Sequence, residues 1–211
     1  MEGSDYWVNR SADDERKDWK DNTDWITGYW NSKNHPHRKL IIDAIKEIGG
    51  VGSVIEVGCN CGPNLSVIKE TYPDIKISGV DLNADAIIKG RRMLGLGRNL
   101  KVANVEDMPF DDDEFDVCLA DAVLMYVGPD KIDDAINEMV RVSKKGIIIL
   151  DWYDEESNSG VVKNHHWTRN YKKLLENKGL EVRKEKITED LWPNKSWMDL
   201  GYLFVAKYLP V

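Results

Sequence analysis

The sequence predicts an α/β fold: a doubly wound, mainly parallel seven-stranded sheet with helices on both faces and an antiparallel last strand. Short apolar segments alternate with helical segments along most of the chain, a pattern typical of right-handed crossovers between parallel strands. The last two expected strands are joined by residues 188–200, which are too few for a crossover helix of normal length with its turns. This final pair is therefore expected to be antiparallel.

The spacing of apolar residues locates the individual elements. Residues 35–48 carry an apolar stripe at helical spacing, and Gly49 and Gly50 end that helix. Further helices are expected near residues 64–71, 84–94, 130–142 and 166–177. Strands are expected near residues 53–57, 75–80, 100–103, 115–120, 146–151, 181–187 and 201–208.

The length of 211 residues suits one α/β domain and is too short for two domains of ordinary size. We expect a single domain over residues 1–211, with a core at 35–211 preceded by an unusual segment, 1–34. This segment is charged but rich in aromatic residues, whereas a disordered tail would be poor in them. We therefore expect residues 1–34 to fold over the core as a lid.

Composition excludes several classes of partner. The formal net charge of −8, from 29 basic and 37 acidic residues, is opposite to the basic footprint of nucleic-acid binders. No apolar run reaches the roughly 18 residues of a membrane span, and the polar N-terminus does not resemble a secretion signal, so we expect a cytoplasmic protein without a membrane partner. The three cysteines are expected to be reduced, and Cys59-x-Cys61 is not paired with a second knuckle, so no metal site is expected.

The segment VIEVGCNCGPNLSVI, from Val54 to Ile68, is the most informative stretch of the chain. It reads as a buried strand, a glycine-containing turn and the start of a helix, with Pro63 at a first-turn position. Gly58 and Gly62 lack a Cβ atom where the backbone turns and approaches a ligand. This arrangement predicts a nucleotide-like cofactor at the end of the strand.

A second strand ends in Asp81, whose carboxylate can accept hydrogen bonds from both hydroxyls of a ribose. A nicotinamide cofactor is the obvious competitor. However, Asn60 stands where the G-x-G-x-x-G pattern has the middle glycine that lets the backbone approach a pyrophosphate, so a cofactor without phosphates fits better. An ordinary strand, turn and helix without a ligand is the remaining alternative.

At this point the sequence resembles the class I, seven-stranded, Rossmann-like S-adenosylmethionine-dependent methyltransferases. The resemblance covers roughly residues 40–208 and rests on EVGCNCG, Asp81, NVEDMPF, FDVCLADAVLMYV and the segment RVSKKG before the strand at 147–151. It implies S-adenosylmethionine as cofactor and S-adenosylhomocysteine as product.

The resemblance assigns the cofactor contacts along the chain. It implies that the methionine part and the ribose lie against Glu56, Gly58, Cys59, Asn60 and Gly62. Leu82 would pack on the adenine ring, and Asn104 with the backbone of Val105 would bind its edge, although the family usually has an aspartate at the position of Asn104. The carbonyls of Leu119 and Ala120 would receive the cofactor's ammonium group. The methionine end would also lie near Tyr29, Trp30 and Arg38.

The methyl acceptor is expected to approach the loop after the fourth strand and the segment after the fifth. Tyr126, His165 and His166 are the candidate catalytic residues, because a histidine can take a proton from a hydroxyl or an ammonium group at neutral pH. The histidines could equally cap the next helix or pack on Trp167. Arg169 could bind an anionic group of the acceptor or pair with an acidic residue.

The resulting hypothesis is methyl transfer to oxygen or nitrogen of a small-molecule acceptor. One alternative is a cofactor-binding or regulatory protein of the same fold that has lost transfer. An aminopropyl transferase is another, but the strand ends show no evident acidic polyamine channel beyond Asp121.

Overall fold

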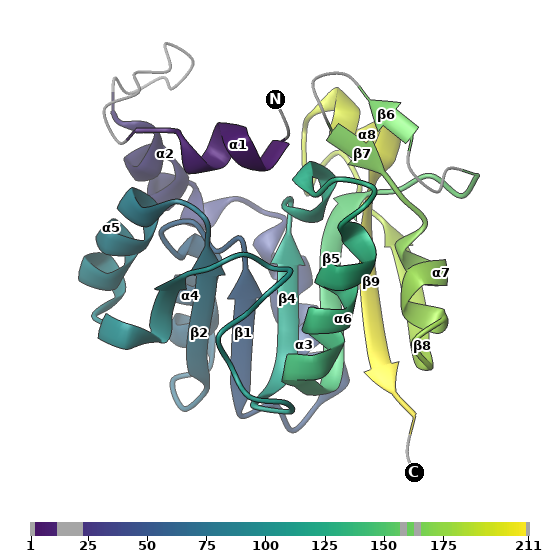
Figure 1. The fold of residues 1–211 in the computed structure, drawn as a ribbon, viewed down its shortest axis with the longest axis horizontal. Coiled ribbons are helices and arrows are strands. Elements are labelled where there is room, and N and C mark those ends of the chain that lie inside the picture. Colours follow the sequence, from purple (N-terminus) through teal and green to yellow (C-terminus); the bar gives the residue numbers. More distant parts are fainter. Residues whose placement is uncertain (1–2, 12–22, 157–159, 163–165, 210–211) are drawn as a thin grey trace.

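A seven-stranded sheet forms the centre of the molecule, and the computed structural model describes residues 3–11, 23–156, 160–162 and 166–209 (Figure 1). The strand order is β3-β2-β1-β4-β5-β9-β8, and β9 runs antiparallel to both of its neighbours while the remaining pairs are parallel. The predicted fold class, including the antiparallel last strand, is confirmed. The seven strands are β1 (Ser53–Val57), β2 (Lys76–Asp81), β3 (Leu100–Val102), β4 (Phe115–Asp121), β5 (Ser143–Trp152), β8 (Leu180–Lys186) and β9 (Gly201–Tyr208).

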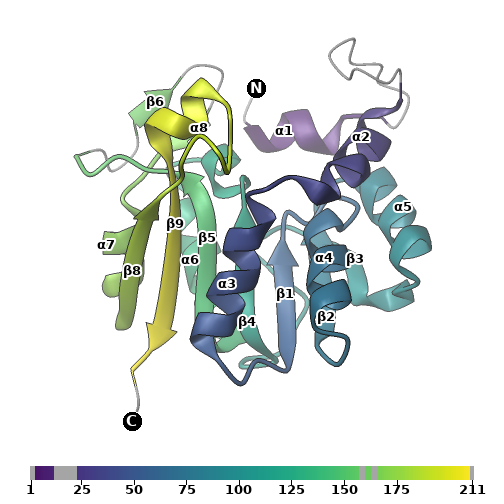
Figure 2. The same ribbon diagram turned by 180° about the vertical axis from the view of Figure 1, so that it is seen from behind.

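Helices cover both faces of this sheet. Helices α3 (Arg38–Ile48) and α4 (Pro63–Thr71) lie across one face (Figure 2), where α5 (Ala84–Leu94) also packs against β2 and β3. The other face carries α6 (Ile132–Val142) and α7 (Tyr171–Glu176) (Figure 1). Each face has its own buried apolar core, as expected for strands that are covered by helices on both sides.

Register brings the ends of the parallel strands together. Val57 of β1 is aligned with Val80 of β2 and with Ala120 of β4, so the residues that follow these strands emerge at the same edge of the sheet. We call this the carboxyl edge. In open α/β sheets ligands bind at this edge, where the strand order changes direction.

Short elements lie above the carboxyl edge (Figures 1 and 2). They are α1 (Gly3–Val8), α2 (Trp25–Asn31), β6 (Gly160–Val162), β7 (His166–Thr168) and α8 (Lys195–Leu200). Three single-turn 3-10 helices complete the fold: η1 (Ser32–Asn34), η2 (Gly97–Asn99) and η3 (Leu124–Tyr126).

The helix expected at residues 166–177 is wrong in its first part. Residues 166–168 form β7, which pairs with β6, and α7 begins only at Tyr171. Aromatic and β-branched residues at Trp167 and Thr168 favour a strand, and the side chain of Asn170 caps the helix by accepting from the backbone N–H of Lys173 (3.0 Å).

The first two helices are anchored by one buried aromatic residue. Trp25 is completely buried, its indole N–H donates to the carbonyl of Ser11 (2.7 Å), and the guanidinium of Arg10 lies 4.2 Å from its ring centre. These contacts tie α1 to α2. That residues 1–211 form a single domain, with residues 1–34 as a lid, stays a prediction. In the part of the chain that the structure covers, we find no helix with the length and apolar character of a membrane span.

Candidate active site

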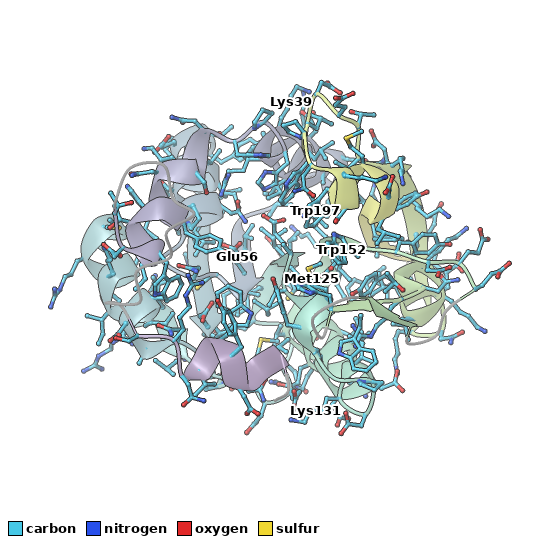
Figure 3. All side chains as sticks on the ribbon, turned by 90° about the horizontal axis from the view of Figure 1, so that it is seen from above. Lys39, Glu56, Met125, Lys131, Trp152 and Trp197 are labelled. Carbon is cyan, nitrogen blue, oxygen red and sulfur yellow. The ribbon has the colours of Figure 1, made fainter. Side chains whose placement is uncertain are left out.

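A cavity of about 600 Å³ lies at the carboxyl edge, between the ends of β1, β2 and β4 and the elements above them. Figure 3 looks down on this edge. The side chains of Glu56, Met125, Trp152 and Trp197, which all line the cavity, gather near the middle of the view, whereas Lys39 lies at the periphery. Acidic groups and aromatic rings therefore share one cavity.

The turn after β1 shapes the floor of the cavity. Gly58, Asn60 and Gly62 all have positive φ angles, of 65°, 51° and 83°. A Cβ atom on Gly58 would lie 2.2 Å from a methyl carbon of Val123, so glycine is needed for close packing as well as for the backbone conformation. Gly62 has a different role, because a Cβ atom there would meet Leu94 of α5 at 2.4 Å.

Asp81 stands at the tip of β2 and lines the cavity. One of its carboxylate oxygens accepts from the backbone N–H of Asn60 and the other from that of Asn83, both at 2.8 Å. Burial raises the pKa of Asp81, and these backbone bonds oppose the rise. Each oxygen has a second lone pair, so the carboxylate can still accept from ligand hydroxyls.

A buried acidic cluster lies at the ends of β1 and β4. The side-chain amide of Asn64 donates to Glu56 (2.6 Å) and to Asp121 (2.8 Å). Within the described part of the chain, the other oxygen of each carboxylate, Oε2 of Glu56 and Oδ1 of Asp121, is buried and accepts no hydrogen bond. Two unsatisfied acceptors on a cavity wall suit a positively charged ligand group such as an ammonium.

The two acids of this cluster titrate differently. Burial holds the pKa of Glu56 well above its usual range, and the bond from Asn64 only partly opposes this. Burial also acts to raise the pKa of Asp121, but His37, Asn64 and Arg38 outweigh it and the pKa is lowered. Asp121 is therefore ionised at neutral pH.

Histidines adjoin this cluster at the start of α3. Nε2 of His37 lies 2.9 Å from Oδ2 of Asp121, and Nδ1 of His37 lies 2.6 Å from Nδ1 of His35. Arg38, next in the chain, is buried and donates to the backbone carbonyl and the hydroxyl of Ser32. Burial lowers the pKa of this guanidinium, which nevertheless remains a cation at neutral pH.

A continuous row of rings forms the opposite side of the cavity, and we call it the aromatic wall. Its neighbouring ring centres are 3.7–6.3 Å apart, and the Trp192 and Trp197 rings stack in parallel at 3.7 Å. The aromatic wall runs in the order Tyr126, His166, Trp152, Trp197, Trp192 and His37. Such a surface binds flat or amphipathic organic molecules.

Buried polar groups hold the wall in place from behind. The guanidinium of Arg169, 1% exposed, donates to the carbonyls of Leu124 and Val127 on either side of Tyr126. Asp151 accepts from the backbone N–H groups of Met125 (3.1 Å) and Trp152 (2.8 Å), and burial raises its pKa to about 7. Arg169 does not line the cavity, and its positive charge acts to lower the pKa of the acidic Asp151.

The structure brings most of the predicted site residues to the cavity. Those that line it are Tyr29, Arg38, Glu56, Gly58, Cys59, Asn60, Asp81, Leu82, Asn104, Val105, Tyr126 and His166. Their roles toward a cofactor or an acceptor stay predictions. His165 falls outside the described residues.

Four predicted cofactor contacts do not line the cavity: Trp30, Gly62, Leu119 and Ala120. Trp30 packs with the lid aromatics instead, and Gly62 serves the contact between α4 and α5. Leu119 and Ala120 are fully buried within β4, and the cavity wall begins with the next residue, Asp121.

Other lining residues were not predicted from the sequence, above all Asp121, Asn64, Trp192 and Trp197. Asp121 follows the same rule that found Asp81, since both are acids at the end of a parallel strand. The two tryptophans come from the connection between β8 and β9, where no local pattern indicates that the chain folds back over the carboxyl edge.

The described residues contain no cluster of three or more histidine, cysteine or acidic side chains arranged to hold a metal ion. All three cysteines are free and buried. Burial raises the pKa of each thiol, so none is a thiolate at neutral pH.

Comparison with known proteins shows which proteins this chain resembles. Residues 54–146 match the family described as a methyltransferase domain. An uncharacterised protein of Haemophilus influenzae is 30% identical over 146 residues, which cover 66% of this chain and 54% of that protein. A ubiquinone/menaquinone biosynthesis C-methyltransferase of Geobacter sp. is 34% identical over 119 residues, covering 52% and 50% of the two chains. This chain thus spans about half the length of these curated relatives.

Solved structures share the fold at low sequence identity. A S-adenosylmethionine-dependent methyltransferase from Aquifex aeolicus superimposes with a TM-score of 0.58 and 19% identity over 85% of this chain and 93% of that chain. A geranyl diphosphate C-methyltransferase from Streptomyces coelicolor A3(2), solved with S-adenosylhomocysteine, gives a TM-score of 0.65 and 16% identity over 98% and 97%.

The strand order, the antiparallel β9 and the cavity at the carboxyl edge define a Rossmann-like methyltransferase fold of class I. The match places residues 54–146 in the methyltransferase-domain family, and the fold around them is that of the class I S-adenosylmethionine-dependent methyltransferases. S-adenosylmethionine is the cofactor that this membership implies.

Proposed function

We propose that this chain transfers a methyl group from S-adenosylmethionine to an oxygen or nitrogen atom of a small organic acceptor. The observation that carries the proposal is the division of one cavity into two parts of different chemistry. Asp81, Glu56 and Asp121 provide carboxylates on one side, and the aromatic wall provides a largely apolar surface on the other. The first part matches the cofactor, and the second suits an acceptor.

The residues present fit the cofactor. Asp81 would bind the two ribose hydroxyls, and the unsatisfied oxygens of Glu56 and Asp121 would receive the ammonium of the methionine part. Leaving such buried acceptors without partners costs about 1–3 kcal/mol each, so a ligand ammonium would relieve that cost. Arg38 lies beside this cluster and would attract the ligand's carboxylate. When bound, the cofactor supplies a methyl group activated by a sulfonium.

The chain's own part in methyl transfer is mainly to position the acceptor and exclude water. A cavity of about 600 Å³ that must also contain the cofactor leaves room for a small acceptor only. The indole N–H of Trp152 is buried and lacks an acceptor among the described residues, so it can donate to an oxygen of that molecule. Among the relatives, one is named as a fatty-acid O-methyltransferase of Mycolicibacterium smegmatis, which is consistent with an oxygen acceptor.

Two measurements test the proposal. Calorimetry should show binding of S-adenosylmethionine and S-adenosylhomocysteine but not of NAD. Incubation with methyl-labelled cofactor and a pool of small metabolites, followed by mass spectrometry, should yield a labelled product. Binding without transfer to any metabolite would favour the alternative of a regulatory protein, and the absence of binding would refute the assignment of the cavity.

A further inference from the structure

We infer that His35, His37 and Asp121 form a proton relay that accepts the proton of the methyl acceptor, so that the acceptor is a hydroxyl compound or a protonated amine. The inference rests on the proposed methyl transfer and specifies its substrate class. It assigns the proton-accepting role to the start of α3, whereas the sequence pointed to Tyr126, His165 and His166.

The distances fix where the protons of the relay lie. Asp121 is ionised and can only accept, so the contact of 2.9 Å requires a proton on Nε2 of His37. The relay starts with His37 as a neutral ring, so its Nδ1 carries no proton. The contact of 2.6 Å between the two Nδ1 atoms therefore requires the proton on Nδ1 of His35. This leaves Nε2 of His35 as the basic atom of the chain.

The relay belongs to the acceptor side of the cavity as well as to the cofactor side. Both histidines line the cavity, and the ring centre of Trp192 lies 5.1 Å from that of His35 and 4.2 Å from that of His37. Trp192 in turn stacks on Trp197. A molecule lying along the aromatic wall therefore meets the relay at one end of the wall.

The charges around the pair allow it to hold one extra proton and not two. Burial, the neighbouring His37 and Arg38 lower the pKa of His35 to about 4, and Asp121 opposes this. A proton received at Nε2 of His35 can be passed on to His37, which lies beside the carboxylate of Asp121. The proton on Nδ1 of His35 then moves to Nδ1 of His37, so that the positive charge lies on His37. Glu56, joined to Asp121 through Asn64, adds a further acid on the same side.

Methyl transfer with the relay moves one methyl group and one proton. A protonated amine first gives its proton to Nε2 of His35, whereas a hydroxyl gives up its proton as the new bond forms. A lone pair of the acceptor's oxygen or neutral nitrogen forms the bond to the methyl carbon, and the carbon–sulfur bond breaks with its electron pair remaining on sulfur. The proton released by the acceptor goes to Nε2 of His35, and the proton between the rings moves to His37. The products are the methylated acceptor, S-adenosylhomocysteine and a relay with one positive charge, which later returns the proton to solvent.

Nitrogen-15 NMR of the full chain labelled at its histidine rings tests the relay without any acceptor. The chain has four histidines, and single exchanges to glutamine assign their signals. With S-adenosylhomocysteine present, we expect His35 as the Nδ1–H tautomer, His37 as the Nε2–H tautomer, and uptake of a single proton by the pair. Asp121→Asn should move this uptake to lower pH by roughly 1–3 units, as loss of an adjacent opposite charge does.

Asp116→Asn is the matched control, because Asp116 is a buried acid of the same strand at the opposite end, where it accepts from the backbone N–H of Gly52 (2.6 Å). It should leave the histidine titration unchanged. Uptake of two protons by the pair, reversed tautomers, or no effect of Asp121→Asn would overturn the relay.

A rate measurement follows, with a panel of phenols and primary amines and with S-adenosylhomocysteine as the product measured. His35→Gln and His37→Gln should lower kcat by roughly 10²–10⁴-fold, the usual contribution of general-base catalysis, and abolish its fall at low pH. For His35→Gln, which does not remove the contact with Asp121, the calorimetric affinity for S-adenosylhomocysteine should change less than threefold. Unchanged rates and pH profiles in these variants, or labelled product methylated at carbon, would refute the relay. Failure of the unaltered chain to bind the cofactor would refute the proposed function instead, whatever the NMR result.

Discussion

Asp81→Asn is the sharpest test of the cofactor site, because it removes the charge at the tip of β2 and keeps the size of the side chain. In the free protein the carboxylate accepts two backbone N–H bonds, from Asn60 and Asn83. The amide can keep one of them, so a loss of about 1–2 kcal/mol in the free energy of unfolding is expected. Loss of charge-assisted bonds to the ribose should cost a further 1.5–3 kcal/mol or so in binding, which corresponds to roughly 10- to 150-fold weaker affinity for S-adenosylhomocysteine.

A ligand comparison separates the ribose bonds from the effect on the turn. We expect the unaltered chain to bind adenosine more tightly than 2′,3′-dideoxyadenosine, and Asp81→Asn to lose most of this difference. Because the two ligands are compared on both chains, any distortion that affects the binding of both ligands equally cancels, as in a double-mutant cycle. Asp116→Asn again serves as the control, because it changes a buried carboxylate with a backbone partner at the far end of the sheet.

Calorimetry at one pH and one salt concentration provides the four affinities of this cycle. If Asp81→Asn still prefers adenosine over the dideoxy compound by the original factor, the carboxylate does not bind the ribose. In that case the nucleoside would lie elsewhere in the cavity, and the reasoning from the strand end would be wrong.

Two further predictions concern the turn after β1 and the lid. Gly58→Ala should lower the free energy of unfolding by at least about 1–2 kcal/mol and weaken cofactor binding, because φ at this position is positive and the new Cβ atom would meet Val123. Chemical unfolding measures the loss of stability, and calorimetry measures the loss of affinity. Burial acts to raise the pKa of Asp24, but hydrogen bonds from Lys89 and Thr27 outweigh it and lower the pKa to about 2. Asp24 caps the N-terminus of α2 by accepting from the backbone N–H of Thr27 (3.0 Å). A carboxyl group whose pKa is lowered by folding stabilises the fold above its unfolded pKa, so the contribution of this cap, roughly 0.5–2 kcal/mol, should be present at pH 6 and be lost as pH falls from about 4 to 2. Unfolding of Asp24→Ala and of the unaltered chain across pH shows whether the difference between their free energies of unfolding disappears.

The fold could be predicted from the sequence because its information is local. Each central strand is a short apolar run, the parallel direction of the strands follows from their alternation with helices, and the antiparallel last strand follows from the short final connection. The error at residues 166–177 has a physical cause. Trp167 and Thr168 are compatible with either state in isolation, and pairing with β6 selects the strand.

The site could be predicted only where it follows directly from a strand. Asp81 and Gly58 sit at strand ends, so the direction of the sheet brings them to the cavity. Trp192 reaches the same cavity from a connection far along the chain, and the pairing of His37 with Asp121 spans 84 residues. Contacts of this kind arise from tertiary packing, which periodicity does not report.

One buried amide joins the lid to the cofactor site. The side chain of Asn83 donates to the carbonyls of Trp7 (2.9 Å) and Arg10 (2.8 Å), its oxygen caps α5, and its backbone N–H donates to Asp81 (2.8 Å). Asn83 is 2% exposed, so water does not replace these bonds. The position of α1 above the cavity is thus coupled to the residue expected to hold the ribose.

Asn83→Asp separates the two functions of this side chain. An aspartate still caps α5, since aspartate and asparagine are equally good at this position, but it cannot donate to the two lid carbonyls. Losing two hydrogen bonds should loosen α1 by about 1–3 kcal/mol. Amide exchange at residues 5–10 should accelerate, and S-adenosylhomocysteine should dissociate faster in stopped-flow experiments, while α5 keeps its exchange protection.

Asp24→Ala, which weakens α2 without touching Asn83, is the comparison. If S-adenosylhomocysteine dissociates from Asn83→Asp at the same rate as from the unaltered chain, although the amides of α1 exchange faster, then α1 does not retain the cofactor. The expected lid would in that case act on the acceptor alone.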